Sequence, residues 1–247
     1  MKKHPRTRAE RISRFVYSFT LFSFILPIAF IIYCLCIWNE AVEAVTGRTY
    51  ADYVLMLMQC LLGIVVIHVP MLFSRQFRVE LPTPLYVMYI VFLYAAIFLG
   101  EVRSFYYKVP YWDSILHAFS SMMTGCLGFM LVALLNRSEQ TKLSLSPFFV
   151  AMFAFCFSLA VGAVWEIYDF FSDALLNTNM QKFITAQGEI VLVHEALTDT
   201  MHDFVIDALG ALLASVTDFF SLRSGKGWAS DLITTYSSKE EKSKRNR

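Results

Sequence analysis

Three pairs of polar residues with helical spacing interrupt apolar stretches in the second half of this 247-residue chain. The pairs are Asp113 with His117, Glu166 with Asp169, and Asp199 with Asp203. Residues three or four apart lie on the same face of a helix, so each pair presents two functional groups to one side. A buried carboxylate without a cationic partner takes up a proton or binds a cation. The pattern therefore indicates either a cation site or a proton path.

The residue types favour a divalent metal site. Carboxylate oxygens combined with one histidine suit Mg²⁺, Mn²⁺ or Zn²⁺, and di-metal proteins build such clusters inside helical bundles. The expected metal ligands are Asp113, His117, Glu166 and Asp203. We expect Asp199 and Asp169 to be catalytic residues that orient a substrate or act as a base. Further polar residues expected at the site are Asp207, Asp173, Arg103 and Lys108.

The same residue types fit three classes of function. A membrane enzyme would use a metal for hydrolysis or group transfer. A proton- or cation-coupled transporter would use the acids as a relay. A non-catalytic membrane partner would use them as a structural network. The polar residues become sparse beyond Asp207, where Ser215 and Asp218 remain, and this counts against transport. Asp218 is expected to be an interfacial charge, and His68, beside Pro70, to be structural.

The composition identifies the elements that must position these residues. Hydrophobic residues make up 57% of the chain and charged residues 17%, whereas soluble domains have about 25% charged residues. The net charge of +1 argues against nucleic acid as a partner. Charge-free stretches are long enough to cross about 30 Å of hydrocarbon as helices. We predict an all-α, polytopic bundle of six transmembrane helices, near 15–38, 53–73, 84–101, 113–135, 147–171 and 199–222.

The distribution of Lys and Arg predicts the topology. A basic segment, 1–14, precedes the first expected helix, and a basic tail, 223–247, follows the last. With a cytoplasmic N-terminus, 17 cationic residues lie inside and four outside, as the positive-inside rule requires. Both termini are then cytoplasmic, and loop 172–198 and the polar pairs face outward. The lipid bilayer is then an expected partner of the chain.

Three segments carry a family resemblance: YWDSILH at 111–117, WEIYD at 165–169 and DTMHDFVIDALGA at 199–211. Their order and helix placement resemble the YjdF-like family of bacterial inner-membrane proteins and, more distantly, the VanZ-like family. The resemblance covers about 105–215. It implies the bacterial cytoplasmic (inner) membrane as the setting and an envelope or lipid-linked substrate as a partner. It implies that Asp113, His117, Glu166, Asp199 and Asp203 occupy the family's polar motif positions. The VanZ-like pattern is not followed after Glu166, so that family's association with glycopeptide resistance is not carried over.

Overall fold

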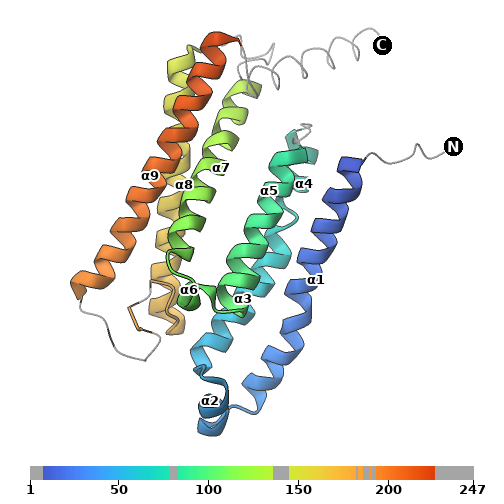
Figure 1. Ribbon diagram of the computed structural model, residues 1–247, viewed down its shortest axis with the longest axis vertical. Coiled ribbons are helices and arrows are strands. Elements are labelled where there is room, and N and C mark those ends of the chain that lie inside the picture. The colour runs from blue at the N-terminus through green and yellow to red at the C-terminus, as the bar shows by residue number, and fades with distance from the viewer. Residues whose placement is uncertain are drawn as a thin grey trace, which may run out of the picture. The chain divides into compact units, whose positions relative to one another are not determined.

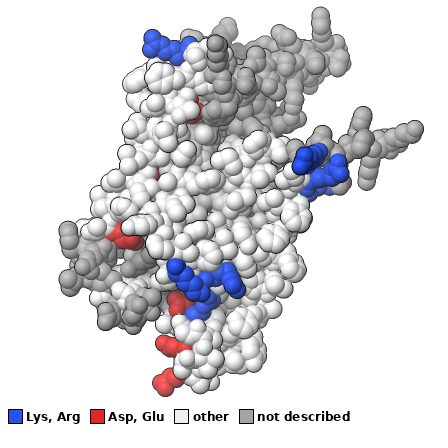
Figure 2. Space-filling view, in the orientation of Figure 1, with Lys and Arg blue, Asp and Glu red and all other residues white. Residues whose placement is uncertain are grey.

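The computed structural model describes residues 8–77, 83–135, 145–181, 183–185, 190 and 193–225. These residues are almost entirely helical, with one isolated bridge between Ile184 and Ile190. In this part of the chain six segments are long and apolar enough to cross a membrane: Arg11–Cys36, Tyr50–Gln76, Thr83–Val102, Trp112–Val132, Pro147–Leu176 and Leu197–Ser224. Most of the described surface in Figure 2 carries no charged side chain. The predicted all-α class and the six apolar helices are confirmed, while the basic tail from 226 lies outside the described residues.

The chain divides into two compact units. The first contains residues 1–116 and 167–199, and the second contains residues 117–166 and 200–247. The boundary falls inside three continuous helices: α7 (Trp112–Leu135), α8 (Pro147–Leu176) and α9 (Val193–Ser224). Each unit has its own apolar interior.

The first unit is built on long helices with a bulky apolar interior. Its main elements are α1 (Arg8–Cys36), α3 (Tyr50–Val66), α5 (Thr83–Leu93) and the π-helix η1 (Tyr94–Val102). Figure 1 shows α1, α3 and α5 running side by side. Their buried residues include Phe24, Ile31, Tyr53, Met56, Ile90 and Ile97. This interior consists mainly of large apolar side chains that fill the space between the helices.

A proline divides the second expected helix. The helix expected near 53–73 is two elements, because α3 ends at Val66 and α4 (Val69–Phe77) begins one residue before Pro70. Proline has no N–H to donate and its ring clashes with the carbonyl four residues earlier, here that of Val66. The hydroxyl of Tyr89 donates a hydrogen bond to this carbonyl at 2.6 Å. The polar group released by Pro70 is therefore satisfied inside the same unit.

Two short helices lie between the long ones. In α2 (Glu40–Thr46) the Asn39 side chain caps the first turn, and Gly47 ends the helix at a φ of 65°, which favours glycine. Arg48 then donates hydrogen bonds to the Val102 carbonyl and the Ser104 hydroxyl, both at 2.8 Å. These bonds hold the α2 loop against the segment that leads into α6 (Phe105–Lys108).

The second unit packs α7, α8 and α9 through small residues, and Figure 1 shows these helices running alongside one another. A Cβ added to Gly125 would lie 3.0 Å from the Cβ of Ala214, and one added to Gly128 would lie 3.2 Å from the Cα of Ala154. The Ser158 hydroxyl also donates a hydrogen bond to the Ser121 carbonyl at 2.8 Å. Small residues and interhelical hydrogen bonds are how membrane helices approach closely, so the polar faces of α7, α8 and α9 come together.

Candidate functional site

His117 lies among three carboxylates in the second unit. Its Nε2 is 3.9 Å from Glu166 Oε1 and 3.8 Å from Asp203 Oδ2. Its Nδ1 is 3.3 Å from Asp207 Oδ1. All four side chains are buried. The imidazole comes from α7, Glu166 from α8 and the two aspartates from α9, so each of the three helices contributes to the group, which we call the His117 cluster.

The two sides of the imidazole differ in a way that matters chemically. Nδ1–H is within hydrogen-bonding reach of Asp207, which makes Nε2 of a neutral ring an acceptor. Nε2 faces the oxygens of Glu166 and Asp203, which when ionised are also acceptors. Their separations exceed the 2.7–3.2 Å or so of a hydrogen bond. Acceptors that converge in this way need a positive species among them, either a metal ion or additional protons.

The arrangement matches a common pattern of metal-bound histidines. Such a histidine donates its second ring N–H to a carboxylate, which fixes its tautomer and orientation. Here Asp207 holds that second position, while Glu166 and Asp203 lie on the ligand side of the ring. Two ligands at about 2.1 Å from a tetrahedral ion are roughly 3.4 Å apart, and Nε2 is 3.8 to 3.9 Å from the two carboxylate oxygens on its side.

Close backbone packing leaves room for Asp207. A Cβ added to Gly162 of α8 would collide with Asp207 Oδ2, while the other carboxylate oxygen, Oδ1, is the one near His117. A Cβ added to Gly210 of α9 would likewise collide with the Ser121 hydroxyl. Gly162 therefore determines where the Asp207 carboxylate fits.

A group of hydroxyl side chains lies beyond the His117 cluster, on residues after His117 in α7 and before Glu166 in α8. Thr124 Oγ1 and Ser158 Oγ are 2.9 Å apart, and Ser158 also bonds the Ser121 carbonyl. Sequence reasoning did not identify this pairing, because the partners lie 34 residues apart and neither belongs to a recognisable motif. The hydroxyls join α7 to α8, which agrees with a packing role for these small residues.

Asp113 precedes His117 by four residues on the continuous helix α7, so both side chains share a face. Asp113 is half-buried, whereas His117 is buried. The expected spacing of this pair is therefore present in the structure.

The other expected site residues belong to the first unit. Asp169 is buried and lies three residues beyond Glu166 on α8, and Asp199 is half-buried and lies four residues before Asp203 on α9. Arg103 and Lys108 are exposed, and Lys108 Nζ donates a hydrogen bond to the Arg103 carbonyl at 3.2 Å.

Asp173 organises the chain that follows α8. Its Oδ1 accepts hydrogen bonds from the Thr178 hydroxyl and the Met180 N–H, both at 2.7 Å. Its Oδ2 accepts one from the Gln181 N–H at 2.9 Å. These contacts satisfy backbone groups at a helix end, so the structure gives Asp173 a structural role that the sequence did not predict.

Asn179 ties the same turn to α6. Its Nδ2 donates hydrogen bonds to the Tyr107 hydroxyl at 3.0 Å and to the Ile184 carbonyl at 2.7 Å. Burial raises the pKa of the Tyr107 phenol, the bond from Asn179 opposes this, and nearby carboxylates add to the rise. The phenol is therefore held in its neutral form as an acceptor.

His68 has the structural environment that its position beside Pro70 predicts. Its Nδ1 is 2.8 Å from the Ile64 carbonyl, so the N–H lies on that side and donates to it. Its Nε2 is then the acceptor for the Tyr17 hydroxyl at 2.9 Å. Both ring nitrogens have neutral partners.

Asp218, for which the sequence suggested an interfacial charge, is turned inward within the second unit. Its side chain is 1% exposed inside the second unit. The reason is helical periodicity: Asp218 follows Asp207 by 11 residues, which is close to three full turns, so both point to the same side of α9. The expectation rested on the nearness of Asp218 to the end of the helix, which does not determine the direction of a side chain.

The apolar spans and the buried group of acids around one histidine define a polytopic helical membrane protein with a polar interior. The chain belongs to the family described as predicted membrane protein (DUF2238), which it matches over residues 13–224. The YjdF-like resemblance is consistent with this family, and the more distant VanZ-like resemblance stays a hypothesis.

One relative is an uncharacterized protein of Thermotoga maritima. It is 28% identical over 146 residues, which are 57% of this chain and 65% of the relative. The chain therefore spans slightly less than two thirds of the length of this relative. No solved structure matches the chain.

Proposed function

We propose that the His117 cluster binds a divalent metal ion and that the protein uses it on an envelope or lipid-linked substrate at the bacterial cytoplasmic membrane. The observation that carries the proposal is the position of the ring: Nε2 faces Glu166 and Asp203 while Nδ1 faces Asp207. A cation at Nε2 would neutralise acids that are otherwise costly to bury in hydrocarbon.

The roles of the residues follow from this geometry. His117, Glu166 and Asp203 would be ligands, with Asp113 as a further ligand from the turn of α7 before His117. Asp207 would orient the imidazole. A bound Mg²⁺, Mn²⁺ or Zn²⁺ would supply Lewis acidity to a phosphoryl or carbonyl oxygen. We propose that Asp169 and Asp199 orient the substrate or act as the base, and that Arg103 and Lys108 receive an anionic head group.

The direct test is metal analysis of protein purified in detergent and exposed to each of the three metals. Wild-type protein should retain about one ion per chain, as a single cluster of this kind holds. The variants His117→Ala and Asp203→Asn should lose it, and His68→Ala should retain it because that histidine has only neutral partners. Equal metal content in the wild type and the first two variants would refute the metal site.

The sidedness of the proposal is testable by cysteine labelling. The excess of cationic residues on one side predicts that Glu43 lies outside and Gln76 inside, and both side chains are exposed. In a background without the five native cysteines, Glu43→Cys should react with an impermeant thiol reagent in intact cells, and Gln76→Cys should not. The reverse labelling would place the substrate on the cytoplasmic side.

A second candidate function, proton- or cation-coupled transport, gains support from the burial of Asp218. Asp218 and Ser221 are 1% and 8% exposed, so buried polar groups extend further along α9 than the sequence indicates. This function predicts that reconstituted protein dissipates a proton gradient across vesicles and that Asp218→Asn stops it. Vesicles that keep their gradient in the presence of the wild type would exclude proton transport.

A further inference from the structure

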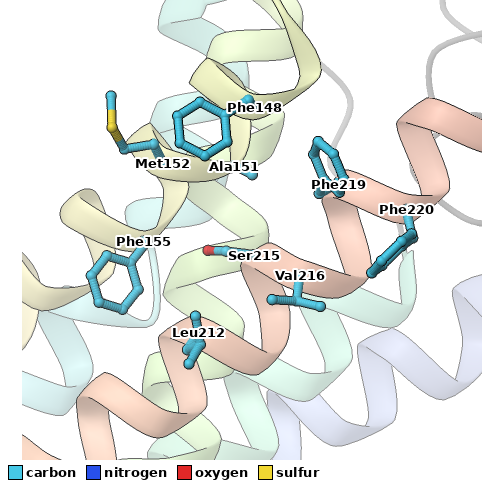
Figure 3. A pocket seen from close by; sticks show the side chains of 9 residues that line it. All are labelled: Phe148, Ala151, Met152, Phe155, Leu212, Ser215, Val216, Phe219 and Phe220. Carbon is cyan, nitrogen blue, oxygen red and sulfur yellow. The ribbon is translucent and has the colours of Figure 1, made fainter.

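A cavity of about 360 Å³ lies between the start of α8 and the end of α9, within the second unit. Nine residues line it, and all but Ser215 are apolar. Figure 3 shows Phe148, Met152 and Phe155 on the α8 side, facing Leu212, Val216 and Phe220 of α9. The His117 cluster uses later residues of α8 and earlier residues of α9. The cavity is therefore at the other end of these helices and shares no residue with the cluster.

The lining favours a flexible hydrocarbon chain over a partner helix. All its residues lie within the candidate spans Pro147–Leu176 and Leu197–Ser224, where the surrounding medium is hydrocarbon. Contacts between membrane helices are enriched in small residues, whereas four of the nine residues that line this cavity are phenylalanines and only Ala151 and Ser215 are small. Its volume is at the lower end of the roughly 300–1,000 Å³ of small-molecule sites.

The length of the α9 segment matches one leaflet of a bilayer. Arg223 is exposed and lies in the last turn of α9. Phe219, which lines the cavity, comes four residues earlier, so the two residues lie on the same face of the helix. From Leu212 to Arg223 the helix rises about 16 Å. Half of the hydrocarbon core of a bilayer is about 15 Å thick. A chain lying in the cavity would thus bring its head group to the level of Arg223.

We propose that this cavity binds one acyl chain of an anionic glycerophospholipid whose phosphate contacts Arg223. The hydrocarbon chain fills the space between the phenylalanines, and the guanidinium supplies the planar pair of donors that suits phosphate oxygens. The proposal goes beyond the function of the His117 cluster and does not depend on it.

The experiment is native mass spectrometry of the full chain, titrated with phosphatidylglycerol or with phosphatidylcholine of identical chains. Leu212→Trp should fill the cavity and abolish the bound-lipid peak. Leu213→Trp is the matched control, because Leu213 is 56% exposed at the same depth of α9 and does not line the cavity. Ala151→Leu fills the cavity from α8 and should repeat the loss if Leu212→Trp fails to fold.

The head-group contact is tested separately. Arg223→Gln should reduce the preference for phosphatidylglycerol over phosphatidylcholine by about fivefold, the effect of one cation near a phosphate. Equal lipid binding by Leu212→Trp and Leu213→Trp would show general surface lipid only and overturn the proposal. A dimer that Leu212→Trp dissociates would assign the cavity to a second copy instead. An unchanged head-group preference in Arg223→Gln would refute the phosphate contact.

The independence of the two sites is tested with the same variant. Unaltered metal content in Leu212→Trp would confirm that the cavity and the His117 cluster are independent.

Discussion

The half-buried His68 of the first unit and the buried His117 of the second unit have opposite surroundings. In the first unit His68 bonds a backbone carbonyl and a tyrosine hydroxyl, so both ring nitrogens meet neutral groups of the right polarity. In the second unit His117 faces three carboxylates and Nε2 is within 4 Å of two of them. A histidine that only joins helices needs the first environment, whereas the second environment concentrates negative charge where a cation can bind.

The aspartates show the same difference. Asp173 of the first unit uses both oxygens to accept hydrogen bonds from the turn after α8, including two backbone N–H groups. Asp203 and Asp207 of the second unit face the imidazole from one side of α9. Burial alone therefore does not distinguish these carboxylates. Asp173 accepts hydrogen bonds from backbone donors, whereas Asp203 and Asp207 lie beside the ionisable imidazole of His117.

The largest expected effect is a difference between variants of the two histidines in how much a divalent metal stabilises the fold. A ligand present at 100 times its dissociation constant stabilises a fold by about 2.7 kcal/mol. His68→Ala should keep this gain on addition of the divalent metal, and His117→Ala should lose all of it. Thermal unfolding in detergent, with and without metal, measures both. Similar metal-induced stabilisation in the two variants would remove the functional distinction between the two units.

Gly162→Ala should have the next largest effect, because the added Cβ collides with Asp207 Oδ2 and displaces the group that orients His117. Loss of such an orienting partner weakens metal binding by about 10- to 100-fold. The matched control is Gly128→Ala, whose added Cβ meets Phe157 and Ala154 instead. Calorimetric titration should show weaker metal binding in Gly162→Ala only. Equal weakening in both would mean that general helix packing, not Asp207, controls the site.

Asp173→Ala should destabilise the turn after α8 in the first unit. The change leaves buried donors such as the Met180 N–H without their acceptor, which costs about 1–3 kcal/mol for each group. Hydrogen exchange at the amides of Met180 and Gln181 should accelerate, and metal content should not change. Asp173→Asn keeps one oxygen acceptor and should show a smaller effect. Loss of metal from Asp173→Ala would give this residue the site role that the sequence indicated.

The smallest expected effect is that of Tyr107→Phe, which removes one acceptor of Asn179 at a partly exposed position. The loss should be about 1 kcal/mol or less. Because the pKa of Tyr107 is raised above its ordinary value of 10, the neutral phenol stabilises the fold below pH 10, and this contribution falls as the pH rises further. Unfolding measured at pH 8 and pH 11 should show the difference between wild type and variant shrinking at the higher pH.

The helical class and the existence of the candidate site could be predicted from composition and spacing. Hydrocarbon admits only backbones whose hydrogen bonds are satisfied internally, so long charge-free stretches must be helices. Asp113 with His117, and Asp203 with Asp207, share helix faces because the helical period is a local property. The division at Pro70 is also local, since the missing N–H and the clash with the Val66 carbonyl both follow from the proline itself.

The partners of each polar group were decided by tertiary structure. Nothing in the local sequence shows that Asp207 lies at Nδ1 of His117 while Glu166 and Asp203 lie at Nε2. The three carboxylates are 49 to 90 positions away from His117 in the sequence, and they meet it only when three helices pack through glycine and alanine. The same holds for Asp173, which the sequence suggests as a site residue, because only the folding of the following turn gives its carboxylate three donors. Spacing along a helix fixes the direction of a side chain, but only packing determines what it meets there.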